Sequence, residues 1–380
     1  MPGIQYLKKK IGLSYLIWLS KGNKYVLLEE PAWFVFSKIA KRHKPSGIAS
    51  LCAERYALSR EECTTFVQDI QSTIEQLNQP ALIDEAIDLD PELRLYRFLP
   101  YSTHTYRLGT SLIKFSFETE DFEYYLHPLI SHLRTDDTSE KASVFELFGF
   151  QGKVVFRLNG EVKGIWTHEE SHLVKGMIFM HLINMMHDKK DDFWLMTVHA
   201  SALSNGRKTI LFPAKPGSGK TTMAAMLQNK GYHMVSDDFV PIDKYEFRAW
   251  PIPLAMSVKQ GAMNLISSMY PEIEDKPLNH ITPEKSVRYL YPGDAQESAL
   301  KAQPVKEFVF ITYEPQVDFQ WQKIAPSRAI ALLLDQSWVS PCEGTAEILL
   351  NQICQWSFYE LTYSDNQKAL DTIVKLFDHD

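Results

Sequence analysis

The chain has 380 residues, of which 45% are hydrophobic and 23% charged, and its formal net charge is −7 at pH 7. This length and composition predict a globular protein with two or three domains and sizeable hydrophobic cores. The negative charge argues against nucleic acid binding over the whole surface, and no apolar run is long enough to span a bilayer as a helix.

The four cysteines are scattered and form no Cys-x-x-Cys pair: Cys52, Cys63, Cys342 and Cys354. This pattern favours reduced thiols in the cytoplasm over disulfides or a cysteine-rich zinc site. Residues 8–19 have the basic and apolar order of a signal peptide, but the apolar part is short and polar residues 21–24 follow it. We therefore expect a β-strand at this position and a cytoplasmic protein.

Residues 1–80 form the first predicted domain. Two strands are predicted around the turn 21–23, and three short amphipathic helices follow; the strands cover 14–19 and 24–28, and the helices 31–41, 47–56 and 60–77. Ser59 and Glu62 form a capping box at the start of the third helix. Two strands followed by three short helices are typical of a small winged-helix domain.

This order of elements, with the sequence YVLLEEPAWFVF at 25–36 leading into a helix, resembles the PqqD-like family. Members of that family recognise the leader segments of ribosomally made, modified peptides. The resemblance covers nearly all of residues 1–80, and it implies that this domain binds the leader of a precursor peptide. The chain departs from the family at Glu29 and Glu30, where the usual entry to the first helix is an apolar residue followed by Asn.

A winged-helix domain can also bind DNA. Residues 1–80 contain 11 Lys and Arg and 7 Asp and Glu, which gives a net charge of +4. No predicted helix has the dense basic face that contacts with phosphates require, so we do not expect nucleic acid binding. A module that only assembles the chain into a homo-oligomer is the other interpretation of these residues.

Residues 78–80 are a predicted linker, and residues 81–380 form the second predicted domain. Its first part is expected to mix strands over 106–117, 153–158 and 161–166 with helices over 122–133 and 171–186, around a polar loop at 134–141.

His168, Glu169 and His172 match the H-E-x-x-H signature of zinc proteases, which places both histidines on one face of an established helix. Thr167 and Glu170 form a predicted capping box, so His168 is expected in the exposed first turn. We therefore do not assign a zinc hydrolase site to this motif.

The central motif of the chain is a phosphate-binding loop of the form G-x-x-x-x-G-K-[ST], with Ala214 in place of the first glycine. It consists of Ala214, Lys215, Pro216, Gly217, Ser218, Gly219, Lys220, Thr221 and Thr222. Its glycines let backbone N–H groups turn toward phosphate oxygens, its lysine is expected to contact the β- and γ-phosphates of ATP, and Thr221 is expected to bind Mg²⁺.

The segments around this loop agree with the motif. Residues 193–202 and 208–212 are predicted strands joined by a hairpin at Asn205-Gly206, and the second strand runs directly into the loop. A helix over 222–230, ended by Gly231, points its N-terminus at the phosphates. The next strand, 232–236, ends in Asp237 and Asp238, a pair suited to a metal contact and a general base.

The remaining residues continue this α/β pattern. A hairpin is predicted over 239–250, a helix after 251–259 and a loop-rich region over 271–300. Strands are then predicted over 305–313 and 358–363, and helices over 327–334, 346–356 and 366–377.

His199, the loop and the sequence VSDD at 235–238 together resemble the catalytic domain of HPr kinase/phosphorylase. His199 precedes Lys220 by 21 residues, and Asp238 follows it by 18. The resemblance implies a P-loop domain with a mixed sheet, in which His199, Lys220 and Asp238 are catalytic. It also implies that Asp238 accepts the proton of the substrate hydroxyl and that Thr221 binds Mg²⁺, and we add Asp237 as the second metal contact.

Thr222 stands where that family has a glutamate, and the arginine-glycine-leucine-glycine stretch linked to the reverse, phosphorylase activity has no counterpart near 251–264. We therefore expect no phosphorylase activity. The segments 305–313 and 358–363 resemble those of HPr-kinase-related enzymes of modified-peptide gene clusters, including lasso-peptide kinases, and this looser resemblance extends over about 98–380.

The sequence thus predicts an ATP- and Mg²⁺-dependent serine/threonine kinase acting on a precursor peptide whose leader binds residues 1–80. Two alternatives stay open. One is an NTP-binding regulator that uses the winged helix on DNA or protein, and the other is a small-molecule kinase that uses residues 1–80 for assembly only.

Overall fold

The computed structural model describes residues 4–80, 91–137, 141–282, 285–293, 301–342 and 344–378, except for the side chains of residues 171, 172 and 282. The chain is mixed α/β, as the sequence predicts. Among the described residues, no helix combines the length and the apolar composition needed to cross a membrane.

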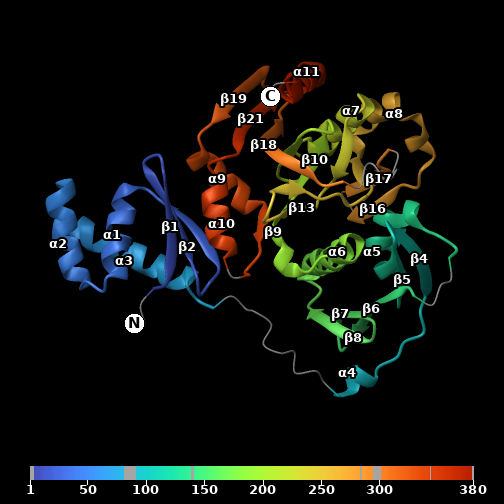
Figure 1. The fold of residues 1–380 in the computed structure, drawn as a ribbon, viewed down its shortest axis with the longest axis horizontal. Helices are drawn as coiled ribbons and strands as arrows, with labels where there is room; N and C mark the ends of the chain where they lie inside the picture. Colours follow the sequence, from blue (N-terminus) through green and yellow to red (C-terminus); the bar gives the residue numbers. More distant parts are fainter. Residues whose placement is uncertain are drawn as a thin grey trace. The chain divides into compact units, whose positions relative to one another are not determined.

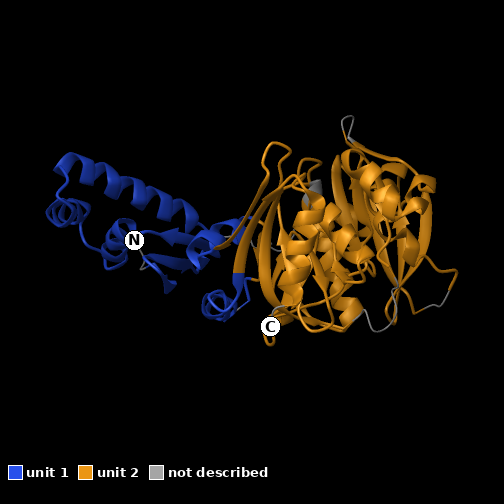
Figure 2. Cartoon of the chain, turned by 90° about the horizontal axis from the view of Figure 1, so that it is seen from above, with its two compact units in different colours: residues 1–86, 324–335, 341–357 blue, residues 87–323, 336–340, 358–380 orange. Residues whose placement is uncertain are grey.

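The chain divides into two compact units (Figure 2). Unit 1 comprises residues 1–86, 324–335 and 341–357, and unit 2 comprises residues 87–323, 336–340 and 358–380. The division expected at residue 80 therefore differs from the compact units, because two C-terminal segments group with the N-terminal residues.

Unit 1 contains an antiparallel sheet in the order β1 (Tyr6–Ile11), β2 (Ser14–Leu19) and β3 (Lys24–Leu28). The two predicted strands are confirmed, but the basic run forms a third strand. Gly12, with a φ of 60°, turns the chain between β1 and β2 and so divides the segment expected to be continuous. The central strand is therefore β2, and the outer strands of this sheet are β1 and β3.

The three predicted helices of unit 1 are confirmed as α1 (Glu30–Ala40), α2 (Pro45–Tyr56) and α3 (Arg60–Leu77). The capping box is also confirmed: Glu62 N–H donates to Ser59 Oγ at 3.2 Å, and Ser59 N–H donates to Glu62 Oε2 at 2.9 Å. Two of the free cysteines, Cys52 and Cys63, lie in the core between these helices, as expected for buried thiols.

The C-terminal segments of unit 1 carry α9 (Pro326–Asp335) and α10 (Thr345–Gln352). Lys9 of β1 donates through Nζ to Asn351 Oδ1 of α10 at 3.2 Å. No local sequence signal marks this contact, because the two residues are far apart in the chain.

Unit 2 is built on a large sheet in which the described strands follow the order β12-β10-β11-β18-β14-β13-β9-β20, with β21 pairing with β18 and β19 (Figure 1). Its strands are β9 (Trp194–Val198), β10 (Ala200–Ser204), β11 (Thr209–Pro213), β12 (His233–Ser236), β13 (Val240–Asp243), β14 (Arg248–Ala249), β18 (Gln303–Tyr313), β19 (Phe319–Ile324), β20 (Ser337–Val339) and β21 (Ser357–Tyr363). Every residue of β9, β10 and β11 is buried, which explains their near-continuous apolar sequences.

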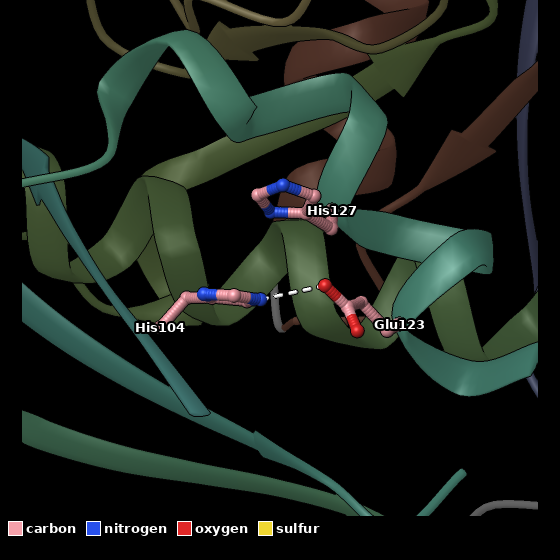
Figure 3. Close-up of side chains that lie close together, drawn as sticks. All are labelled: His104, Glu123 and His127. Carbon is pink, nitrogen blue, oxygen red and sulfur yellow. Dashed lines mark hydrogen bonds and ion pairs between the residues drawn. The ribbon is translucent and has the colours of Figure 1, made fainter. Parts of the chain in front are cut away.

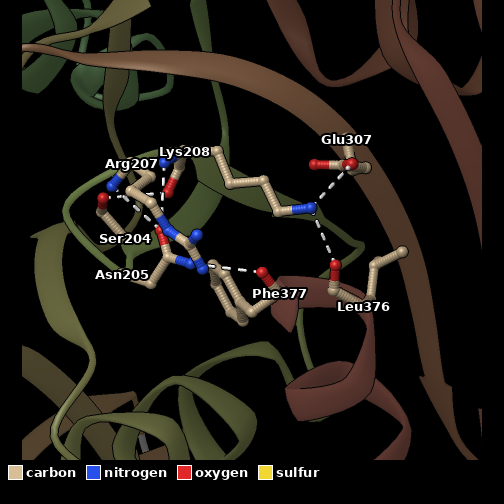
Figure 4. Close-up of polar contacts among 7 residues, drawn as sticks. All are labelled: Ser204, Asn205, Arg207, Lys208, Glu307, Leu376 and Phe377. Atoms are coloured by element: carbon tan, nitrogen blue, oxygen red, sulfur yellow. Dashed lines mark hydrogen bonds and ion pairs between the residues drawn. The ribbon is translucent and has the colours of Figure 1, made fainter. Parts of the chain in front are cut away.

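The predicted hairpin at Asn205-Gly206 joins β10 to β11, and Gly206 has a φ of 85°. Figure 4 shows how this turn is tied to the rest of unit 2. Lys208 Nζ donates to Glu307 Oε1 at 3.2 Å and to the Leu376 carbonyl at 2.8 Å, near the end of α11 (Asn366–Asp378). The lysine thus satisfies a helix C-terminal carbonyl and fixes the end of the sheet opposite the phosphate loop.

A second sheet of unit 2 has the order β4-β5-β6-β7-β8 and packs with α5 (Glu120–Ile130) and α6 (Ser171–His187) around one aromatic core. Figure 1 shows α6 between this sheet and the large one. The strands are β4 (Ser102–Leu108), β5 (Ser111–Phe117), β6 (Ser143–Phe150), β7 (Lys153–Leu158) and β8 (Glu161–Trp166). The prediction of one strand over 106–117 was wrong, because Gly109, with a φ of 57°, turns the chain and divides this segment between β4 and β5. The sequence analysis also missed β6.

A third sheet has the order β15-β17-β16, with β15 (Met256–Lys259), β16 (Asn279–Thr282) and β17 (Lys285–Leu290). It packs with α7 (Lys220–Asn229), α8 (Met263–Met269) and α11 in a second core of unit 2. The sequence analysis missed these three strands, since it placed a helix after residue 259 and loops over 271–300.

Candidate active site

Three chain segments meet where strands of the large sheet end, and we call this place the loop edge. The segments are His199, the phosphate loop 214–222 and the Asp237-Asp238 pair. Strand β10 runs antiparallel to both β11 and β12, with Ala200 opposite Pro213 and Ala202 opposite Ser236. The start of β10 therefore lies beside the ends of its two neighbours. This register brings His199, the phosphate loop and the Asp237-Asp238 pair together, although they are spread over about forty residues of sequence.

His199 interrupts what the sequence predicts as one strand over 193–202. The chain leaves β9 at Val198 and enters β10 at Ala200, and these two strands pair with different neighbours. The backbone N–H of His199 donates to the Gln336 carbonyl at 2.7 Å. The break frees the histidine from the sheet and leaves its ring half-buried at the loop edge.

The phosphate loop connects β11 to α7, with Gly219 as the N-cap of the helix. Gly217 and Gly219 have φ values of 95° and 91°, a left-handed conformation that glycine adopts without strain. A Cβ on Gly219 would lie 2.8 Å from Tyr363 Oη and 3.2 Å from Tyr313 Cβ. Gly219 is thus required both by its backbone conformation and by close packing.

Lys220 and Asp238 form an ion pair between Nζ and Oδ1. The lysine is buried and the side chain of Asp238 is half-buried. Burial lowers the pKa of Lys220, but the charges of Asp238 and Asp237 outweigh burial and raise it overall. Burial raises the pKa of Asp238, and the Lys220 charge more than reverses this effect, so the carboxyl is held ionised. The φ of Asp238 is 66°, a left-handed value that aspartate tolerates better than most residues.

Asp237 is buried behind this pair. Ser201 donates its hydroxyl to Asp237 Oδ1, and Thr221 Oγ1 donates to Oδ2 at 3.2 Å. Burial, together with the charge of Asp238, raises the pKa of Asp237 to about 6. The hydroxyl oxygen of Thr221 and the carboxylate of Asp237 are hard oxygen donors placed side by side, and they fit Mg²⁺.

His199 faces the same groups. Its Nδ1 lies 3.1 Å from the Asp238 carbonyl oxygen, which can only accept, so Nδ1 carries the proton of this bond. Burial lowers the pKa of His199, and the nearby Lys220 charge lowers it further. The ring is therefore neutral at pH 7, with Nε2 unprotonated.

His199, Lys220, Thr221 and Asp238 line a cavity of about 440 Å³, whereas the buried Asp237 is not among its lining residues. It is lined by residues of the loop edge, of β15 and β17 and of the start of α11, including His199, Lys215, Pro216, Gly217, Gly219, Lys220, Thr221, Thr222, Asp238, Ser257, Lys259, Lys285 and Asn366. Tyr363 also lines it, and its buried hydroxyl has no hydrogen-bond partner among the described residues. A volume of this order accommodates a nucleotide-sized ligand.

Two residues of the predicted loop, Ala214 and Ser218, are not among the residues that line the cavity. Ala214 is buried in the second core of unit 2, and Ser218 donates its hydroxyl back to the Lys215 carbonyl at 2.9 Å. The cavity is lined by the remaining members of the motif, from Lys215 to Thr222.

No role was predicted from the sequence for Lys259, Lys285 or Arg288. The structure separates them, because the first two line the cavity while the guanidinium of Arg288 donates to the Glu274 carbonyl at 2.7 Å and to the Lys276 carbonyl. The missed strands β15 and β17 explain why the two lysines meet. Lys259 ends the first strand and Lys285 begins the second, and the antiparallel pairing brings these ends near each other.

Lys175 of α6 is a further cation that sequence reasoning missed. Burial lowers its pKa to about 8, partly offset by the charge of Asp238, while Lys285 lowers it further. Its Nζ lies 4.0 Å from the centre of the Tyr125 ring. Lys175, Lys220 and Lys259 interact electrostatically with Asp238, and the charge of Lys285 acts on Lys175 and Lys259. This positive environment is suited to phosphate groups.

The H-E-x-x-H match does not form a helical metal site. Helix α6 begins at Ser171, so the predicted capping box was wrong in place: His168 precedes the helix and is exposed. The predicted pairing of Thr167 with Glu170 is present in part, because Glu170 Oε2 accepts from the N–H and hydroxyl of Thr167 at 3.0 Å each, but it lies in the turn before the helix.

No protein-family model matches the chain, and no curated protein matches it in sequence. Glycine-rich backbone at a helix N-terminus, a buried lysine, paired carboxylates and further lysines are chemically suited to a polyphosphate beside a proton acceptor.

Proposed function

We propose that the chain is an ATP-dependent kinase that transfers the γ-phosphoryl group to a Ser or Thr hydroxyl of a ribosomally made precursor peptide or small protein. The proposal rests on one observation: Lys220 and Asp238, the charged groups that phosphoryl transfer requires, meet in a cavity lined by a phosphate-binding loop.

In the structure these two groups neutralise each other. When ATP enters, its phosphates compete for Lys220, and the lysine exchanges Asp238 for the β- and γ-phosphates. Loss of the lysine raises the pKa of Asp238 and makes it a better base. The ion pair is thus a resting state in which nucleotide binding exposes the catalytic carboxylate.

In the transfer step, the Ser or Thr oxygen forms a bond to the γ-phosphorus while the bond from phosphorus to the β,γ-bridging oxygen breaks and ADP leaves. The hydroxyl proton passes to Asp238. Lysine cations and loop N–H groups stabilise the charge on the phosphates. Thr221 and Asp237 would hold Mg²⁺, which neutralises phosphate charge when bound.

His199 acts in this proposal as a positioning residue. Its Nδ1–H holds the carbonyl of Asp238, and with it a backbone in the left-handed region. A neutral ring with an unprotonated Nε2 does not donate to a phosphate at pH 7. This differs from the catalytic role that the resemblance to HPr kinase/phosphorylase implied for His199.

The peptide class of the substrate rests on the resemblance of residues 1–80 to PqqD-like domains. The predicted helices of that domain are present, and an extended leader segment would pair with an outer strand of its sheet. Because β2 is paired on both sides, the strands available for such pairing are β1 and β3.

The test is radiolabel transfer from [γ-³²P]ATP and Mg²⁺ to an array of synthetic peptides with Ser, Thr, Tyr or Ala at a fixed central position. The full chain should label Ser and Thr peptides, and the Lys220→Ala variant should not. Nucleotide binding with slow hydrolysis and no labelled peptide would instead indicate an NTP-dependent regulator. Label on free small-molecule alcohols would indicate a small-molecule kinase.

A further inference from the structure

A second group of polar side chains lies in unit 2, away from the phosphate loop. His104 of β4 and Glu123 and His127 of α5 point toward one another (Figure 3). One ligand atom from each of the three residues lies within 4.8 Å of the other two. We call these residues the His104 cluster; they form the only such His, Cys, Asp or Glu group among the described residues that could hold a metal ion.

Two features of the fold bring the cluster together. Glu123 and His127 are four residues apart on α5, so their side chains share one face of the helix. His104 comes from the neighbouring strand β4, and its Nε2 lies 2.6 Å from Glu123 Oε1. The two histidine rings are stacked, with centres 4.5 Å apart. The three donors are thus already gathered by helix periodicity and by the packing of α5 on the sheet.

Hydrogen bonds to neighbouring residues restrict the cluster. Tyr106, a fully buried residue of β4, lies with its hydroxyl 2.6 Å from His127 Nδ1. Nδ1 of His104 is buried and has no hydrogen-bond partner among the described residues. Because Nε2 is the His104 nitrogen that faces Glu123, Nε2 is the atom that would bind a metal, and Nδ1 lies outside the donor set.

From these observations we propose that His104, Glu123 and His127 form a Zn²⁺-binding site. Two imidazoles and one carboxylate are a donor set that zinc takes in proteins, leaving a fourth position for water or a ligand. Donors in a tetrahedral zinc site lie about 3.3 Å apart, which follows from metal–ligand bonds of about 2 Å. The His104–Glu123 pair is 2.6 Å apart and would open by about 0.7 Å to reach this spacing. His127 would bind through Nε2, because its Nδ1 is held by Tyr106.

The cluster borders a cavity of about 340 Å³, so the fourth position can be reached. Glu123 and His127 line this cavity, and Glu120, Lys276 and Tyr289 contribute to its walls. The Lys276 ammonium lies 4.5 Å from the centre of the Tyr291 ring, on the same cavity. A metal with one open position facing a lysine would suit a small anionic ligand.

The test measures zinc in the full chain without a histidine tag, by elemental analysis after dialysis and by competition with a chromophoric chelator. We expect one zinc per wild-type chain. Glu123→Gln and His127→Gln should each weaken zinc binding by at least about 100-fold, the upper end of what outer-shell changes produce. His168→Gln, in the H-E-x-x-H sequence, is the matched control that should keep the metal.

Several outcomes would overturn the proposal: no stoichiometric zinc in the wild type, zinc retained in both cluster variants, or zinc lost in His168→Gln. Zinc-edge X-ray absorption of the wild type decides the question even if the variants do not fold. We expect two imidazoles and oxygen ligands, whereas sulfur ligands or a fully hydrated ion would contradict the assignment.

Discussion

The loop edge and the His104 cluster lie in the same unit and both gather polar side chains from separate elements. The loop edge is built around a contiguous motif whose residue types indicate a phosphate site. The residues of the cluster match no motif, since His104 and Glu123 are 19 residues apart with a strand and a turn between them. The H-E-x-x-H sequence is the opposite case, a motif whose first histidine lies outside the helix.

This comparison teaches that a motif indicates a site only when secondary structure presents its residues together. Strand register does this at the loop edge, and the face of α5 does it in the cluster. Each prediction below either separates the two sites or tests how one of them is assembled.

The largest effect is expected at the phosphate loop. Lys220→Ala should abolish phosphoryl transfer, because the charge of the β- and γ-phosphates is then uncompensated in a buried site. It should leave zinc content unchanged. Radiolabel transfer measures the first and elemental analysis the second, with Lys230→Ala, an exposed lysine beyond the other end of α7, as the control. Normal turnover in Lys220→Ala would show that the loop is not the active site.

Asp238→Asn should reduce transfer by roughly 10²–10⁴, the usual contribution of a positioned general base. Asparagine tolerates the left-handed backbone at this position, so the loss reports on the carboxylate rather than on strain. Nucleotide affinity, measured by calorimetry with Mg-ADP, should stay within a few-fold. If Asp237→Asn removed transfer while Asp238→Asn kept it, the roles of the two carboxylates would be reversed.

The third prediction concerns pH and stability. The folded pKa of Asp237, about 6, lies above its ordinary value of 3.8. Ionised Asp237 therefore destabilises the nucleotide-free fold above pH 6, by up to about 3 kcal/mol, and this penalty disappears as the pH falls toward 3.8, where both states are protonated.

Asp237→Asn should consequently stabilise the nucleotide-free chain by about 1–3 kcal/mol above pH 7, and the gain should shrink at acid pH. Urea unfolding at several pH values without Mg²⁺ gives the comparison. A gain that does not depend on pH would mean that the carboxyl is not the cause. The same substitution should weaken the Mg²⁺ dependence of transfer, so that stability and activity move in opposite directions.

Close packing of the loop gives a smaller effect. Gly217 and Gly219 are both left-handed, so alanine at either position costs about 1–2 kcal/mol of backbone strain. Only at Gly219 does the added Cβ meet fixed atoms, those of Tyr363 and Tyr313, whereas at Gly217 the nearest atom is the mobile Lys259 Nζ at 3.8 Å. Gly219→Ala should therefore lose about 1–3 kcal/mol more than Gly217→Ala in urea unfolding. Equal losses would show that the contact with the two tyrosines is not close.

Much of this architecture could be predicted from sequence, because its signals are local. The turn at Asn205-Gly206, the capping box at Ser59 and the loop glycines each fix backbone geometry within a few residues. The break at His199 could not be predicted, since its apolar flanks continue the strand pattern on both sides and its backbone partner, Gln336, is remote in sequence.

Strands β15 and β17 were not predicted from the sequence for a related reason. They are short, and pairing with each other and with β16 decides their conformation more than their own sequences do. For that reason, the sequence did not predict that the cavity residues Lys259 and Lys285 lie near each other. The His104 cluster depends in the same way on how α5 packs against β4, which no spacing in the sequence encodes.

The smallest effect is expected for energetic coupling between the two sites. Strand β17 connects them, because Tyr289 lines the cavity beside the His104 cluster and Lys285 lines the cavity at the loop edge. Among the described residues, the two cavities share no lining residue. Sites without shared partners usually act additively, within about 0.5 kcal/mol.

Zinc should therefore change the affinity for Mg-ADP by less than about 2-fold, which is the same 0.5 kcal/mol expressed as a ratio. Calorimetry of Mg-ADP binding with and without bound zinc measures this ratio, and Glu123→Gln serves as the control that cannot respond to zinc. Linkage requires Mg-ADP to change zinc affinity by the same factor, so the reverse titration checks the result. If zinc and Mg-ADP each changed the affinity for the other tenfold, and Glu123→Gln removed this effect, the two sites would not be independent. Such a result would identify β17 as the element whose position both ligands change.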